Sequence, residues 1–157
     1  MKLVIAICLL LPLLLSCGKN NNSRPENVGY GITLLRNSVD IPSACKAAFV
    51  ALSGEKRFEM ANPGDRYQEA DVVREKGLPW RRLIFAAVRQ KRCAIEYEKG
   101  GIGKSIHLVI LDTSTKPATF VWGGPQVIQS NDIAGLREKL TSQAPADAHS
   151  RSLQQYW

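Results

Sequence analysis

Three residues near the middle of the chain have the side chains of a hydrolase triad: Ser105, His107 and Asp112. A triad needs a nucleophile, a base that takes its proton and an acid that orients the base. Here Ser105 and His107 stand two positions apart in one expected strand, and Asp112 follows at its end. The strand-to-helix elbow that exposes a nucleophilic serine is absent from the pattern. We interpret the combination as coincidence and predict no catalytic residue.

A glycine-rich stretch, KGGIGKS at positions 99–105, invites comparison with a phosphate-binding loop. That motif needs a further glycine where this chain has Glu98, and it must lead into a helix whose N-terminus faces the phosphates. The stretch here leads into an apolar run typical of a strand. We therefore expect a hairpin turn in which the glycines supply positive-φ positions.

Two acidic residues and two histidines are the remaining candidates for site chemistry. Glu96 and Glu98 alternate along an expected strand, about 6.5–7 Å apart, which is near the carboxylate spacing of glycosidases. No other feature of the sequence suggests a sugar cleft, so we interpret the pair as part of a solvated strand face. His107 and His149 are too few for a zinc site, and we predict no metal and no cofactor.

Basic residues gather at the ends and turns of the expected strands. The chain carries a formal net charge of +7, which fits an anionic partner, although we predict no nucleic-acid binding. Cationic side chains in such places also suppress edge-to-edge pairing of sheets, so solubility is the simpler explanation. The alternative is an anion-binding rim formed by Arg81, Arg82, Arg89, Lys91, Arg92 and Lys104.

The N-terminus carries the strongest functional signal. Met1 and Lys2 precede a run of thirteen mostly aliphatic residues, 3–15, which is shorter than the roughly 20 that span a bilayer as a helix. This pattern predicts a signal peptide over 1–16. The run ends in Leu14-Leu15-Ser16-Cys17, which resembles the lipobox of bacterial lipoproteins.

That resemblance implies a lipid anchor in a bacterial cell envelope. In the family, the cysteine thiol receives a diacylglycerol group, the chain is cut before it, and the new amino group is usually acylated, with palmitate expected among the acyl groups. Cys17 would be the modified residue here. Gly18 stands where an aspartate resembles an inner-membrane retention signal, so the outer membrane, facing the periplasm, is favoured if the organism has two membranes.

Two cysteines then remain in the exported domain, Cys45 and Cys93, because Cys8 leaves with the signal peptide. An even pair in an oxidising compartment is usually bridged. Cys45 lies on the apolar side of an expected helix, and Cys93 shares a strand face with Ile95 and Tyr97. We predict a disulfide between them, with two buried thiols as the alternative.

The elements indicate an α+β fold. Apolar runs bounded by turn residues predict an antiparallel meander over 82–123 in a sheet of four to five strands, including a weak strand within 28–35. The run 105–111 is apolar on both faces, which places it centrally. A helix over 41–53, capped by Asp40 and ended by Gly54, packs on one face. A C-terminal helix with Ile133, Leu136 and Leu140 at helical spacing lies beside it.

The length of 157 residues, 45% apolar and 22% charged, fits one soluble domain. We expect a flexible tether over 17–27, the domain over 28–142 and a disordered tail over 143–157. The leading hypothesis for function is a non-enzymatic binding or structural domain held at the membrane. An inhibitor or protective lipoprotein acting on another envelope enzyme, and a cell-envelope hydrolase, remain alternatives.

Overall fold

A six-stranded antiparallel sheet forms the centre of the structure, a computed structural model that describes residues 24–73, 75–125 and 132–141. Each strand pairs with the next one in the chain, so the predicted meander and the α+β class are confirmed. The sheet has six strands, not four or five. The strands are β1 (Glu26–Asn27), β2 (Thr33–Leu35), β3 (Arg81–Arg89), β4 (Arg92–Lys99), β5 (Ser105–Asp112) and β6 (Thr119–Gly124).

The weak strand expected within 28–35 is a turn followed by a short strand. Gly29, Tyr30 and Gly31 all have positive φ, at 91°, 53° and 70°, so the chain reverses there and β1 pairs with β2. The glycines that weakened the strand pattern therefore make a hairpin. Strand β1 occupies the last two residues of the expected tether, whereas positions 1–23, including Cys17, and the expected tail 143–157 lie outside the described residues.

The first helix begins two residues later than expected. Residues Ser38–Asp40 form a short 3-10 helix, η1, whose cap is the Asn37 side chain, and α1 (Ser43–Ser53) follows it. Asp40 therefore belongs to η1 and does not cap α1, because the extended Ile41 and Pro42 separate the two. Gly54 ends α1 as expected, with φ 70° and its N–H donating to the Val50 carbonyl.

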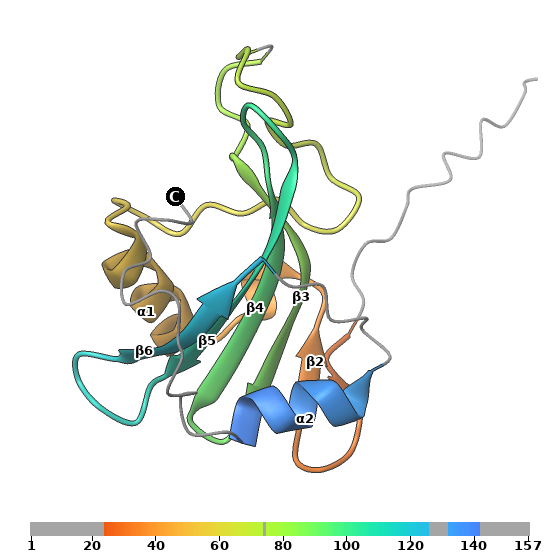
Figure 1. Cartoon of the computed structure of the whole chain (residues 1–157), viewed down its shortest axis with the longest axis vertical. Coiled ribbons are helices and arrows are strands. Elements are labelled where there is room, and N and C mark those ends of the chain that lie inside the picture. The colour runs from red at the N-terminus through yellow and green to blue at the C-terminus, as the bar shows by residue number, and fades with distance from the viewer. Residues whose placement is uncertain (1–23, 74, 126–131, 142–157) are drawn as a thin grey trace, which may run out of the picture.

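Both faces of the sheet are covered, as Figure 1 shows with α1 and α2 (Ile133–Thr141) on different sides of the strands. Phe49 of α1 packs with Ile95 and Tyr97 on one face. Leu136 and Leu140 of α2 belong to the core of the other. The expectation that the two helices lie side by side is wrong: they sandwich the sheet, and we name the two sides the α1 face and the α2 face.

The interpretation of Glu96 and Glu98 as part of a solvated strand face is wrong. Glu96 is completely buried and Glu98 is 9% exposed, whereas the alternation in β4 suggested a face in water. The apolar residues on both faces of β5, an interior strand between β4 and β6, were the sequence signal of a sheet covered twice.

The disulfide between Cys45 and Cys93 is present, with their Cα atoms 6.2 Å apart, so this prediction is confirmed. It joins α1 to β4 within the core of the α1 face. The distance lies in the ordinary range for disulfides. One helix of the sandwich is thus covalently fastened to the sheet.

Candidate functional site

The β4–β5 hairpin and a long irregular segment before β3 are joined into one projection. A parallel bridge pairs Ala70 with Gly101, and the N–H of Gly100 donates to the Trp80 carbonyl at 3.0 Å. Figure 1 shows the segment and the hairpin rising together above the helices. We call this part, residues 66–73, 75–80 and 99–104, the hairpin end.

Gly100 makes the joint possible. A Cβ atom at this position would lie 1.7 Å from the Gln68 carbonyl oxygen, so no other residue permits the same approach. Gly101 has a φ of 147°, which L side chains rarely adopt, whereas Gly100 and Gly103 do not have the positive φ expected of them. The glycine-rich loop is therefore a packing contact as well as a turn.

On the α2 side of the hairpin end, the buried carboxylate of Glu98 pairs with two cationic side chains, Arg82 and Lys104. Glu98 accepts from Arg82 Nε at 2.8 Å, and its other oxygen lies 2.6 Å from Lys104 Nζ. Burial acts to raise the pKa of Glu98, but the hydrogen bonds from Lys104 and Arg82 outweigh it and lower the pKa. The Arg82 guanidinium also lies over the Tyr67 ring, 4.5 Å from its centre. These contacts hold the irregular segment to the sheet.

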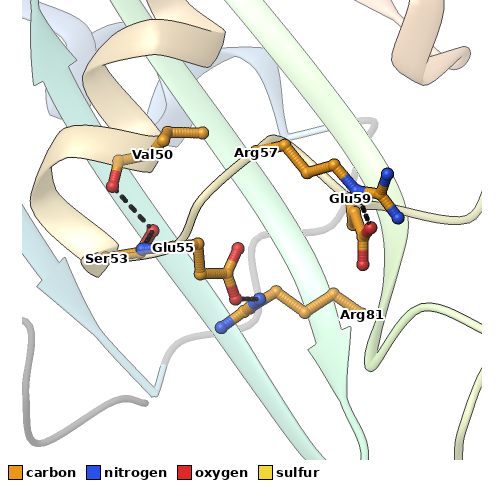
Figure 2. Close-up of polar contacts among 6 residues, drawn as sticks. All are labelled: Val50, Ser53, Glu55, Arg57, Glu59 and Arg81. Carbon is orange, nitrogen blue, oxygen red and sulfur yellow. Dashed lines mark hydrogen bonds and ion pairs between the residues drawn. The ribbon is translucent and has the colours of Figure 1, made fainter.

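Arg81, the next residue of the candidate rim, points to the opposite face. Its side chain is 6% exposed and forms an ion pair with Glu55 just after α1, which Figure 2 shows beside the surface pair of Arg57 and Glu59. The guanidinium lies 5.7 Å from the centre of the Phe49 ring. Arg81 therefore contributes to the core of the α1 face and offers little surface to a ligand.

The other three rim candidates lie at the far end of the sheet, where Arg89 pairs with Arg92 next to the β3–β4 turn. Arg89 Nε donates to the Tyr30 carbonyl at 3.2 Å. Arg92 donates to the Leu140 carbonyl at 3.3 Å, near the C-terminus of α2. Lys91 is exposed between them. The structure thus distributes the six predicted rim residues over three separate places.

Ser105 and His107 do meet, with Ser105 Oγ 2.7 Å from His107 Nε2. Burial, with the nearby charges of Lys99 and Arg81, lowers the pKa of His107 to about 4, so the imidazole is neutral at pH 7 and is a weaker base than an ordinary histidine. Asp112 pairs with Arg92 at the other end of β5, and a hydrogen bond from Ser114 lowers its pKa. The three residues therefore do not form a triad.

A cavity of about 260 Å³ opens at the hairpin end. Val72, which lines the cavity, is 65% exposed, and two further apolar side chains of the hairpin end are exposed as well, Val73 at 56% and Ile102 at 98%. Sequence reasoning missed this site, because its residues come from a segment without periodicity; the isolated isoleucine between glycines was the one available signal. The cavity is lined by Arg66, Tyr67, Gln68, Glu69, Ala70, Val72 and Leu78.

Within the described part of the chain, no group of three or more histidine, cysteine, aspartate or glutamate residues could hold a metal ion. Neither helix there is long and apolar enough to cross a membrane. No family model, curated protein or solved structure matches the chain. Proposals about its function therefore depend on its own residues.

Proposed function

We propose that the chain is a lipid-anchored protein of a bacterial cell envelope and that its α+β domain is a binding module. The anchor is Cys17, supported by the apolar run 3–15 and the Leu14-Leu15-Ser16-Cys17 pattern. The disulfide between Cys45 and Cys93 supports export, because such bonds persist in oxidising compartments. If the organism has two membranes, Gly18 favours the periplasmic face of the outer membrane.

The tether holds the domain close to the bilayer. Eight residues, 18–25, separate Cys17 from the start of β1, and a fully extended chain of that length spans at most about 28 Å. A domain on so short a tether meets membrane-associated proteins far more often than proteins that diffuse through the compartment. Its partner is therefore another envelope component.

One observation carries the proposal that the domain binds rather than catalyses. Val72 lines the cavity at the hairpin end, and Val72, Val73 and Ile102 of the same end are all exposed; exposed apolar side chains that gather into one patch are a feature of interaction sites. Inhibition or protection of an envelope enzyme is one form that such binding can take. A hydrolase is the second candidate, favoured by the contact between Ser105 and His107.

Labelling with radioactive fatty acid tests the anchor. The wild-type protein should incorporate label and stay in the membrane fraction after a salt wash, whereas Cys17→Ala should incorporate none. Cys8→Ala is the matched control, because Cys8 lies in the expected signal peptide and should leave labelling unchanged. Label retained by Cys17→Ala, or absent from the wild type, would contradict the anchor.

Hydrolysis is tested separately. Ser105→Ala in the isolated protein should leave binding to an envelope partner unchanged. A hydrolytic activity towards cell-wall or lipid substrates that disappears in Ser105→Ala would replace the binding module with the hydrolase.

A further inference from the structure

Three turns and helix α2 meet at the end of the sheet opposite the hairpin end. Arg89 Nε donates to the Tyr30 carbonyl at 3.2 Å, and Arg137 of α2 lies over the Tyr30 ring, 4.5 Å from its centre. The N–H of Thr113 donates to the Lys91 carbonyl at 2.8 Å. Figure 1 shows these turns and α2 at the bottom of the view, with the hairpin end at the top. We call this part, residues 28–32, 89–92, 112–118 and 137–141, the turn end.

The turn end carries an excess of positive charge. Its six cations and two carboxylates give a net charge of +4, from Arg89, Lys91, Arg92, Lys116, Arg137 and Lys139 against Asp112 and Glu138. Five more charged residues lie within five positions of these segments, namely Arg24, Glu26, Arg36, Glu96 and Asp132. With two cations and three carboxylates, they lower the balance only to +3. The turn end therefore suits an anionic surface.

The hairpin end is closer to neutral by the same count. With Arg74 included, it has five cations and three carboxylates, Arg66, Arg74, Lys76, Lys99 and Lys104 against Glu69, Asp71 and Glu75. The charged residues within five positions of it are Asp65, Arg81, Arg82, Glu96 and Glu98, which lower its net charge from +2 to +1. Of the two ends of the sheet, the turn end is thus the more basic.

Most cations at the turn end are not neutralised by a carboxylate. Arg92 Nε lies 3.7 Å from Asp112 Oδ2. Four others form no ion pair with any described residue: Arg89, Lys91, Lys116 and Arg137. Arg89 and Arg92 also stand directly opposite each other in the β3–β4 pair, and like charges in that position are destabilising. An anionic surface would offset this repulsion.

An exposed aromatic ring stands in the β1–β2 turn. Tyr30 is 63% exposed and has a φ of 53°, a conformation that is costly for a bulky residue and free for glycine. Tyrosine is enriched at membrane–water interfaces, where its ring and its hydroxyl face different surroundings. The turn end therefore combines unpaired cations with a side chain suited to the headgroup layer.

The tether enters the domain near the turn end. Glu26, the first residue of β1, pairs with Leu34, and Leu34 pairs with Ala87. At about 3.4 Å per residue, this level of the sheet is about 7 Å from Arg89 and about 20 Å from Arg81, beyond which the hairpin end begins. The bilayer that holds the lipid anchor is thus nearer the turn end, and the short tether keeps its concentration there high.

We propose that the turn end lies on the anionic surface of the bilayer that holds the anchor, so that the hairpin end points away from it and is free to bind a partner. This inference rests on the proposed lipid anchor. The contact is electrostatic, so it should weaken as salt is added. Each exposed cation should change the ratio of docked to undocked protein about fivefold.

Fluorescence quenching in vesicles measures which end of the domain touches the bilayer. The processed full chain, with one added cysteine carrying a dye, is inserted through its own anchor into vesicles that contain phosphatidylglycerol and a lipid with a nitroxide on its headgroup. Ser114→Cys places the dye at the turn end, and Ile102→Cys places it at the hairpin end; both positions are exposed. The dye at position 114 should be quenched much more strongly.

The added cysteine is the only free thiol in these proteins. Cys45 and Cys93 are bridged, Cys17 is acylated under the proposed function, and Cys8 leaves with the signal peptide. The dye therefore reports from one position.

Single substitutions test the cations. Lys91→Gln should lower the ratio of docked to undocked protein about fivefold. Lys76→Gln is the matched control, because Lys76 is an exposed lysine of the hairpin end that forms no ion pair with any described residue, and it should leave the ratio unchanged. Tyr30→Gly, which suits the positive φ, should also weaken docking, while circular dichroism stays unchanged in all three variants.

Three results would overturn the proposal: equal quenching at positions 114 and 102, docking that persists in vesicles of phosphatidylcholine alone, or equal sensitivity to Lys76→Gln. Docking that inorganic phosphate abolishes, but sodium chloride of equal ionic strength does not, would assign the turn end to a soluble anion instead. Protein that leaves the vesicles indicates that the anchor has failed. Protein that stays with them and is quenched equally at both ends refutes only the docking.

Discussion

The two faces of the sheet are covered by helices of similar length that are attached in different ways. On the α1 face, the disulfide joins Cys45 to Cys93, and Phe49 makes edge contacts with Phe58 and Tyr97 at 5.5 and 5.6 Å between ring centres. On the α2 face, Leu136 and Leu140 are the buried side chains of the helix. The first helix is thus fastened covalently, whereas the second is held by apolar burial and by noncovalent contacts such as the hydrogen bond from Arg92 to the Leu140 carbonyl.

Because the two helices are attached differently, they need not unfold together. Segments with few buried contacts open locally at a lower free energy than the core. Helix α2 has nine residues and two buried leucines, and a helix that short is marginal without its packing. We therefore expect α2 to detach before α1 when the protein is stressed.

Removing the disulfide should cause the largest loss in the free energy of unfolding. Replacing both Cys45 and Cys93 by alanine frees a loop of about 49 residues in the unfolded chain, which corresponds to about 4 kcal/mol in the chain-entropy model. Urea unfolding of the variant and the wild type measures the difference. A loss below about 1 kcal/mol would mean that packing alone holds α1.

Leu136→Ala should have the next largest effect. The Leu136 side chain is 1% exposed and packs on the α2 face of the sheet. Truncation of a buried leucine to alanine lowers the free energy of unfolding by about 3 kcal/mol. Hydrogen exchange should show faster exchange at α2 amides with little change in α1. Glu138→Ala, on the exposed side of the same helix, is the control; equal acceleration in both helices would show that the faces unfold as one unit.

The strongly patterned parts of the chain could be predicted from the sequence. The runs that form β3, β4 and β5 are long and bounded by turn residues, and the helical spacing of Cys45, Ala48 and Phe49 identified the buried side of α1. The disulfide followed from counting cysteines in an exported chain. These features depend on local pattern, which a sequence states directly.

Other features depend on contacts between distant segments. Glu96 and Glu98 alternate as in a strand with one solvated face, yet that face is covered: Ala94 packs with Leu136 and Leu140 of α2, and Glu98 pairs with Arg82 and Lys104. The hairpin end was missed for the same reason, because Gly100 and Gln68, which pack so closely that a Cβ at position 100 would lie 1.7 Å from the Gln68 carbonyl oxygen, share no common periodicity. The local sequence does not predict which turn a loop will pack against.

The smallest expected effect is on acid stability. As the pH falls, the packing of the α1 face should be destabilised before that of the α2 face. His107 stacks on Tyr97, with ring centres 5.5 Å apart, and burial with the charges of Lys99 and Arg81 lowers its pKa to about 4. The unfolded chain, with a histidine pKa of about 6.5, therefore binds more protons between these values. Stability should fall as the pH drops from 6.5 to 4.5, by about 2 kcal/mol.

His107→Phe should flatten this fall, because phenylalanine can stack on Tyr97 and does not titrate. Glu98→Gln is the matched control on the α2 face: the lowered pKa of Glu98 means that its contribution is present above the ordinary glutamate pKa and is lost only at lower pH. That variant should be less stable at pH 7 yet keep the fall between pH 6.5 and 4.5. If urea midpoints across this window decline equally in the wild type and His107→Phe, the imidazole is not the group that senses acid. The α1 face would then owe its acid response to another group.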